Sequence, residues 1–126
     1  MKRIIETSKA PAPVGPYSQA VESGGTLYCS GQIPIVPESG ELLTGDIQKQ
    51  AEQVMKNIEA VLTEAGYVWT DVIKTAIFLT DLGDFAQVNE IYAKYFSEVP
   101  PARSCVQVAA LPKGVNVEIE VIARKD

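Results

Sequence analysis

The chain has 126 residues, of which 46% are hydrophobic and 21% charged, and its formal net charge is −5. These values are typical of a single globular domain, expected here over residues 1–126, and they argue against a disordered chain. The acidic balance argues against non-specific binding to nucleic-acid phosphates, although one buried arginine can still bind a small anion locally.

The chain contains no histidine. This excludes Ser-His-Asp triads, Cys-His pairs and histidine-ligated metal sites. Cys29 and Cys105 lie in apolar, strand-like segments without the spacing of metal ligands, so we expect no metal site and two buried free thiols in a reducing compartment. No apolar run approaches the roughly 20 residues of a membrane span, and the N-terminus lacks a signal-peptide pattern. A cytoplasmic location is therefore expected.

The first third of the sequence predicts three short strands and two loops. Strands are expected at 3–6, 17–23 and 26–34, and Gly24-Gly25 between the last two is a strong hairpin signal. The segment KAPAPVGP (9–16) is predicted to be a loop, because residues before proline are driven into extended conformations. The segment VPESGELLTG (36–45) is predicted to be a second loop.

An amphipathic helix is predicted over residues 46–65. Its apolar residues recur with the helical period of 3.6, so that they form one buried stripe. Asp46 suits the N-terminus of this helix, and Gly66 suits its C-terminal cap. The stripe consists of Ile47, Ala51, Val54, Met55, Ile58, Val61, Leu62 and Ala65.

A central strand and a second helix follow. Residues 71–81 are rich in β-branched side chains and apolar on both faces, which indicates a strand inside the sheet. Asp84, with Gln87 three residues later, forms a capping-box pattern for a helix that ends before Pro100. This helix is expected to bury Phe85, Val88, Tyr92, Tyr95 and Phe96.

Two strands, roughly 103–110 and 115–124, close the chain around the turn LPKG. The predicted order is β-β-β-α-β-α-β-β, an α+β fold whose mixed sheet carries both helices most economically on one face. The other face would then expose valine and isoleucine side chains to water. We therefore infer that further subunits cover it.

Strand alternation places the chemically active residues of the closing strands. Arg103 and Cys105 point the same way on their strand, whereas Glu118 and Glu120 share one face of the next. We therefore expect an arginine and two carboxylates on adjacent closing segments, at the edges of apolar faces. They could form a surface ion pair worth about 0–1 kcal/mol. Alternatively, Arg103 could bind a carboxylate in bidentate fashion while a glutamate handles water. Periodicity alone does not choose between these interpretations.

Five segments, in order along nearly the whole chain, carry a specific resemblance. They are APVGPYSQAV (12–21), SGQIP (30–34), TGDIQKQAEQVMKNIEAVL (44–62), KTAIFLTDLGDFAQVNEIYAKYF (74–96) and PARSCVQVAALPKGVNVEIEVIA (101–123). Together they are similar to the Rid family, the reactive intermediate deaminases once called YjgF, and most similar to its RidA subgroup.

The resemblance implies a chorismate-mutase-like α+β fold, assembled as a homotrimer with sites in the clefts between subunits. It also implies hydrolysis of 2-imino acids and their enamine tautomers, such as 2-iminobutanoate and 2-iminopropanoate, to 2-oxo acids and ammonia. This chemistry needs no cofactor, because an iminium carbon is already electrophilic and orientation with a positioned water suffices. Partners would be the small substrate and other copies of the chain, with neither nucleic acid nor membrane.

The matching motifs assign roles to residues of this chain. By resemblance, Arg103 would bind the substrate carboxylate, and Glu118 rather than Glu120 would position the attacking water and can shuttle its proton. The remaining pocket residues would be Tyr17, Ser30, Gly31, Asn89 and Cys105. The alternative function is that of a non-catalytic regulatory protein, in which the same cleft binds a 2-oxo acid.

Overall fold

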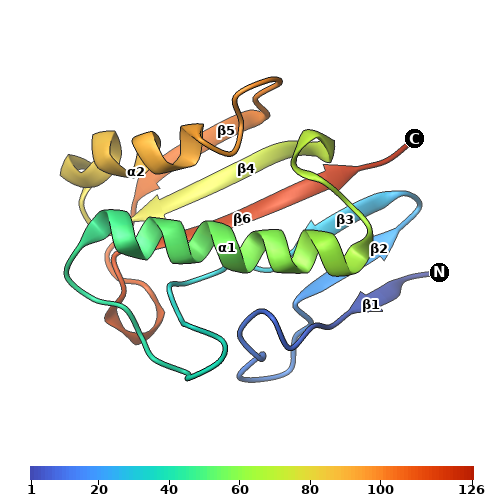
Figure 1. Ribbon diagram of the computed structural model, residues 1–126, viewed down its shortest axis with the longest axis horizontal. Coiled ribbons are helices and arrows are strands. Elements are labelled where there is room, and N and C mark those ends of the chain that lie inside the picture. The colour runs from blue at the N-terminus through green and yellow to red at the C-terminus, as the bar shows by residue number, and fades with distance from the viewer.

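The computed structural model describes all residues, 1–126, and its elements follow the predicted order (Figure 1). Three short 3₁₀ turns connect some of these elements, at Trp69–Asp71, Leu82–Asp84 and Pro112–Gly114. The elements are β1 (Arg3–Ile5), β2 (Ala20–Ser23), β3 (Thr26–Cys29), α1 (Ile47–Ala65), β4 (Val72–Leu79), α2 (Phe85–Ala93), β5 (Ala102–Gln107) and β6 (Val117–Arg124).

The six strands form one mixed sheet in the order β1-β2-β3-β6-β4-β5. Only β4 and β5 pair in parallel, and the other neighbours are antiparallel. The predicted central position of β4 is confirmed, because it lies between β6 and β5. The expectation that the closing strands are adjacent is wrong. The crossover through α2 places β5 beside β4 at the edge of the sheet, and β6 then pairs between β3 and β4.

Helix α1 begins and ends where the sequence predicts. The Asp46 side chain accepts hydrogen bonds from the backbone N–H groups of Gln48 and Lys49, which satisfies donors that the first turn leaves free. Gly66 ends the helix with φ of 86°, a conformation that glycine adopts without strain. The whole predicted apolar stripe is buried, together with Gln50 and Asn57.

The start of α2 differs from the prediction. The Asp84 side chain makes no capping hydrogen bond, so the predicted capping box does not form. Instead, Asp81 accepts from the Gly83 N–H at 2.8 Å and begins a 3₁₀ turn that runs directly into the helix. The helix ends at Ala93, and Tyr95 and Phe96 pack against the core from the segment that follows it.

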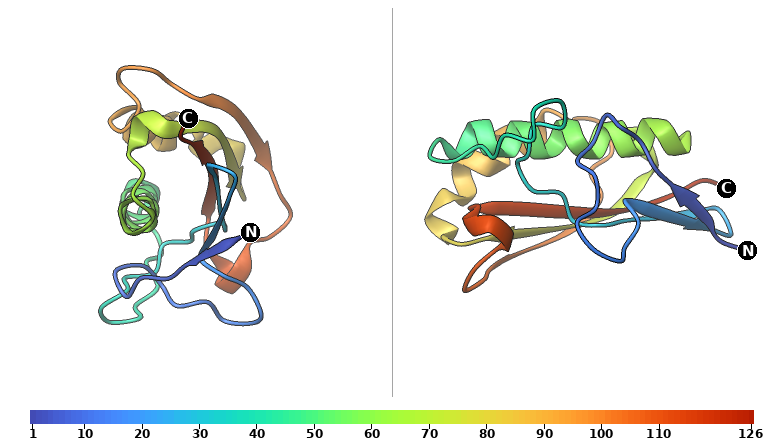
Figure 2. Two further views of the ribbon diagram at one scale, coloured as in Figure 1. Left: turned by 90° about the vertical axis from the view of Figure 1, so that its right-hand side faces the viewer. Right: turned by 90° about the horizontal axis from the view of Figure 1, so that it is seen from below.

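Both helices pack on one face of the sheet and leave the other face open, as Figure 2 shows from the side. The buried side chains of β4 and β6 point toward the helices, whereas Tyr28, Ile73 and Val106 of the sheet remain 52%, 49% and 45% exposed. This is the chorismate-mutase-like α+β architecture expected from the sequence. None of its helices is long and apolar enough to cross a membrane.

Candidate functional site

Arg103 lies on β5 at one edge of the sheet and reaches over α2. Its Cζ is 5.2 Å from the centre of the Phe85 ring and 5.0 Å from that of Tyr92. Its Nη1 donates a hydrogen bond of 2.7 Å to Oδ1 of Asn89. Both distances to the rings are within the range at which the face of an aromatic ring attracts a cation.

No carboxylate of the chain lies within 4 Å of the Arg103 guanidinium, since the two ion pairs of the molecule involve Arg3 and Arg124. Of the three arginines of the chain, Arg103 alone has no carboxylate within this distance. The predicted surface ion pair is therefore absent, and the positive charge remains free for an external anion. The guanidinium opens onto a surface groove of about 420 Å³ that is lined by Asn89, Tyr92, Ala93, Phe96, Pro100, Pro101 and Arg103.

Two residues of this group, Phe85 and Tyr92, were predicted only as core. The sequence does carry a signal for their contact with Arg103. Residues at positions i, i+4 and i+7 share one face of a helix, so Phe85, Asn89 and Tyr92 form a single stripe. Only the parallel pairing of β5 with β4, however, brings Arg103 across from α2.

Cys105 shares the helix-facing side of β5 and packs against the edge of the core. It is a free thiol, as expected, but it is only partly buried, whereas Cys29 is fully buried. Burial raises the pKa of Cys105, and the opposing influence of the Arg103 charge is smaller. Burial also raises the pKa of Cys29, to about 12. Both thiols are therefore protonated at neutral pH, which suits a wall residue better than a nucleophile. We call Arg103, Asn89, Cys105, Phe85 and Tyr92 the arginine cluster.

Glu118 lies on the opposite, open face of the sheet, because its neighbours Val117 and Ile119 point into the core. Its carboxylate packs so closely on Gly31 that a Cβ atom there would lie 2.2 Å from Oε2. Any larger residue at position 31 would force the Glu118 side chain to move. Desolvation raises the pKa of Glu118 above its usual value, and the nearby negative charge of Glu120 adds to this effect.

Ser30 directly precedes Gly31 in the chain and therefore lies near Glu118. Ser30 is tied to the loop that carries Tyr17, since its Oγ donates to the Ser18 carbonyl at 2.6 Å and its N–H donates to the Gln19 carbonyl at 2.9 Å. The Tyr17 side chain is 54% exposed. We call Glu118, Gly31, Ser30 and Tyr17 the glutamate cluster.

The predicted site residues thus divide between the two sides of one sheet, with Arg103, Asn89 and Cys105 on the helix side and Glu118 with Gly31 on the open side. In the register of the sheet, Arg103 on β5 pairs with Thr75 of β4. Glu118 lies on β6, on the other side of β4, and pairs with Phe78. Three residues along a strand and two inter-strand spacings separate these positions by about 10 Å in each direction. The sheet itself lies between the two side chains. One chain therefore cannot bring Arg103 and Glu118 onto the same small molecule.

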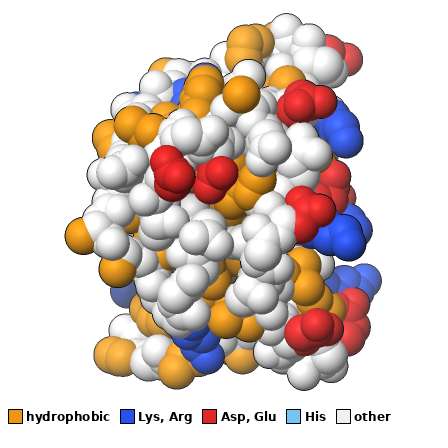
Figure 3. All heavy atoms as spheres, turned by 90° about the vertical axis from the view of Figure 1, so that its left-hand side faces the viewer, with side chains coloured by type: hydrophobic (Ala, Val, Ile, Leu, Met, Phe, Trp, Pro, Cys, Tyr) orange, Lys and Arg blue, Asp and Glu red, His pale blue; other side chains and the backbone are white.

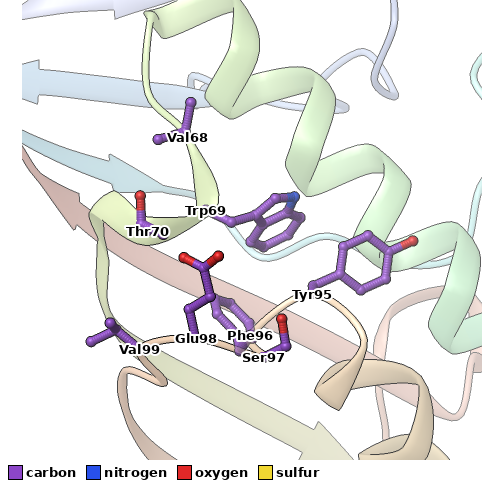
Figure 4. A pocket seen from close by; sticks show the side chains of 8 residues that line it. All are labelled: Val68, Trp69, Thr70, Tyr95, Phe96, Ser97, Glu98 and Val99. Atoms are coloured by element: carbon purple, nitrogen blue, oxygen red, sulfur yellow. The ribbon is translucent and has the colours of Figure 1, made fainter.

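Two other hollows lack the features of an anion site. The first, of about 300 Å³, is bounded by Trp69 and Phe96 and contains no basic side chain (Figure 4). The second lies between the starts of α1 and α2. Figure 3 views the molecule from this end, and the basic side chains there alternate with acidic ones along the right-hand margin rather than forming a continuous stripe. This second hollow contains Asp46 and Asp84 among neutral polar groups. The structure contains no group of three or more His, Cys, Asp or Glu side chains placed to hold a metal ion.

Comparison with known proteins gives consistent matches over the full length. A family model described as Endoribonuclease L-PSP matches residues 7–125. A RutC family protein of Pyrococcus horikoshii is 53% identical over 126 residues, which is 100% of each chain. TdcF of Escherichia coli, a candidate reactive intermediate deaminase, is 49% identical over 126 residues, covering 98% of this chain and 97% of TdcF.

Solved structures agree with these matches. The crystal structure of YyfA from Yersinia pestis, a protein of the Rid family, superposes with a TM-score of 0.97 at 55% identity, covering 99% of this chain and 100% of YyfA. The crystal structure of Escherichia coli TdcF with bound serine superposes with a TM-score of 0.94 at 46% identity, covering 98% and 99% of the two chains.

Proposed function

The chain belongs to the Rid family, and from that membership we propose that it hydrolyses 2-imino acids and their enamine tautomers to 2-oxo acids and ammonia. The substrates would be small, such as 2-iminobutanoate and 2-iminopropanoate. The observation that carries the proposal is Arg103, a guanidinium with aromatic rings and an amide around it but no carboxylate partner. Its remaining N–H groups are available to bind the carboxylate of the substrate.

The ligand bound to a relative supports this substrate class. The TdcF crystal structure contains bound serine, which has a carboxylate and a nitrogen on the adjacent carbon. A 2-imino acid places its carboxylate and nitrogen on the same two carbons. A site that binds one can therefore bind the other through the same polar contacts.

Glu118 is the proposed base for water. A water molecule held by the carboxylate adds its oxygen to the carbon of the protonated imine (iminium), Glu118 accepts the proton that the water loses, and a neutral carbinolamine forms. Glu118 then returns the proton to the nitrogen. The C–N bond breaks as the carbinolamine hydroxyl forms the C=O bond and gives its proton to Glu118, which passes it to the departing ammonia, so that the products are the 2-oxo acid and ammonium. The raised pKa of Glu118 suits both steps, because a carboxyl closer to neutrality returns a proton more readily. The Gly31 N–H has no acceptor within the chain and can donate to the substrate.

We propose that the complete site forms between subunits of a homotrimer. The arginine cluster of one chain and the glutamate cluster of another would meet there, since they lie on opposite faces within each chain. The open sheet face, with its half-exposed Tyr28, Ile73 and Val106, supports this assembly. Light scattering should give about 41 kDa, three times the chain mass of 13.6 kDa. A stable monomer would contradict the shared site.

The function is tested by coupling a threonine dehydratase to the protein and following the decay of 2-iminobutanoate. Wild type should accelerate the decay, and Arg103→Ala should lose most of this acceleration. Arg3→Ala removes an arginine from the opposite edge of the sheet and should keep it. Equal acceleration by wild type and Arg103→Ala would remove the assignment of Arg103. Calorimetric binding of 2-oxobutanoate without any acceleration of decay would favour the non-catalytic regulatory protein instead.

A further inference from the structure

We propose that Tyr92, together with Phe85, is a positioning residue that holds the Arg103 guanidinium in the orientation that receives the substrate carboxylate. This inference rests on the proposed function and adds residues to the site that no sequence motif assigned. It begins from the contacts of Arg103, whose Cζ lies 5.0 and 5.2 Å from the centres of the two rings.

The Arg103 side chain needs neighbours that restrict it, because Arg103 lies on an edge strand. β5 has a neighbour on one side only, and Arg103 is exposed. A long side chain in such a place samples many rotamers unless its neighbours restrict it. Asn89 fixes one nitrogen of the guanidinium, and the two rings limit the positions of its plane. Loss of either ring would therefore let the Arg103 guanidinium sample more orientations.

Tyr92 is itself held in place by contacts with core residues. Its hydroxyl shares a hydrogen bond of 2.7 Å with Oγ1 of Thr75, and these residues are only 5% and 1% exposed. Its ring also packs on Phe96, with ring centres 4.7 Å apart. Burial raises the pKa of Tyr92, so the phenol stays neutral. Thr75 is the β4 residue in register with Arg103, so a rigid connection runs from the sheet through Tyr92 to the guanidinium.

Aromatic rings suit this task better than a carboxylate would. A carboxylate would fix the arginine equally well but would occupy the N–H groups that the substrate needs. The face of a ring attracts the cation without accepting its in-plane hydrogen bonds. The expected consequence is specific: the rings contribute to substrate binding and leave the chemical step unchanged, so their loss raises KM more than it lowers kcat.

The test compares three variants. Tyr92→Leu removes the ring but keeps an apolar side chain, and Tyr92→Phe restores the ring without the hydroxyl. Tyr95→Leu is the matched control, because Tyr95 belongs to the same aromatic group, 5.1 Å from Trp69 between ring centres, but does not contact Arg103. For each variant, the decay of 2-iminobutanoate gives KM and kcat, and thermal unfolding gives Tm. The NMR resonances of the Arg103 guanidinium, assigned by their loss in Arg103→Lys, report its packing independently of activity.

We expect Tyr92→Leu to raise KM about tenfold, with kcat changed less than about threefold. The Arg103 resonances, shifted by ring currents in wild type, should move toward those of a free arginine. Tyr92→Phe, which keeps the ring, should have a KM and Arg103 resonances close to those of wild type. Tyr95→Leu should lower Tm while leaving KM and the Arg103 resonances in place. If Tyr92→Leu fails to fold, Phe85→Leu at the half-buried start of α2 replaces it, with the same two readouts.

Equal KM values for Tyr92→Leu and Tyr95→Leu would overturn the inference, as would a wild-type Arg103 resonance at the position of free arginine. Failure of the proposed function looks different. In that case wild type would neither bind 2-oxobutanoate nor accelerate decay, yet the Arg103 resonances would still respond to Tyr92→Leu. That result would uphold the packing of Arg103 on the rings and reject the substrate.

Discussion

The two edges of the sheet each carry an arginine, and their surroundings differ. Arg3 on β1 donates from Nε to Glu22 at 2.9 Å and from Nη2 to the Ala65 carbonyl, at the end of α1, at 2.9 Å. Arg103 on β5 has an amide and two rings but no carboxylate. The charge of Arg3 is thus used within the fold, whereas that of Arg103 is left for a ligand. The difference suggests that an arginine whose neighbours orient it without neutralising it marks a binding site.

The largest effect is expected at Glu118, the proposed base of the glutamate cluster. Glu118→Gln keeps the shape of the side chain but removes the base, so the rate of imine hydrolysis should fall about 100-fold. The same change should raise Tm at pH 7, because desolvation and Glu120 disfavour the charged form of Glu118. A raised pKa means that ionisation of Glu118 costs stability as pH rises through that pKa. The advantage of the variant should therefore disappear as pH falls toward 4.5, the usual value of the carboxyl pKa.

Melting curves of wild type and Glu118→Gln between pH 4 and pH 8, together with the decay assay, measure both effects. Full activity in the variant would show that Glu120 or another group handles the water. A Tm advantage that grew at low pH would contradict the stated cause of the pKa shift.

A smaller effect is expected from giving Arg103 a carboxylate partner, as Arg3 has in Glu22. Asn89→Asp places a carboxylate where the amide oxygen now accepts from Nη1 of Arg103. The new ion pair should compete with the substrate and raise KM about tenfold, with kcat nearly unchanged. Asn89→Ser removes the amide acceptor without adding charge and so measures the loss of the Asn89 hydrogen bond alone; its KM should rise less than that of Asn89→Asp. Unchanged KM in Asn89→Asp would mean that the free charge of Arg103 does not govern binding.

The smallest effect is expected from removing the carboxylate partner of Arg3, so that Arg3, like Arg103, has none. Glu22→Gln removes the ion pair with Arg3 and weakens the acceptor for the Tyr67 hydroxyl, so Tm should fall slightly at pH 7 while hydrolysis is unaffected. The hydrogen bond from Arg3, followed by that from Tyr67, lowers the pKa of Glu22 below 4.5. The stabilisation is therefore present above that pH and is lost as pH falls through the lowered pKa. A Tm difference that persisted at pH 2 would contradict an origin in this ion pair.

Local features of the fold could be predicted from the sequence because neighbouring residues determine them. The caps Asp46 and Gly66 and the apolar stripe of α1 depend on helical geometry alone. The hairpin at Gly24-Gly25 depends on two residues that adopt positive φ, here 59° and 81°. The open sheet face also followed from the order of the elements.

The arrangement of the site depends on contacts between distant parts of the chain, and sequence patterns give no direct signal for them. Alternation correctly gave the face of each closing strand but not their order, because the insertion of β6 beside β4 is a property of the whole sheet. The separation of Arg103 from Glu118 therefore went unpredicted. The contact of Tyr92 with Arg103 was missed for a similar reason, since a buried aromatic on a helix is most often only core.

The most direct test is a crystal structure of the assembled protein with 2-oxobutanoate. The ligand carboxylate should lie about 2.7–2.9 Å from the guanidinium nitrogens of Arg103. Glu118 of a neighbouring chain should lie beside the keto carbon of the ligand, where water would attack the imine. A ligand bound elsewhere, or an Arg103 side chain turned away from Phe85 and Tyr92 into solvent, would contradict the shared site.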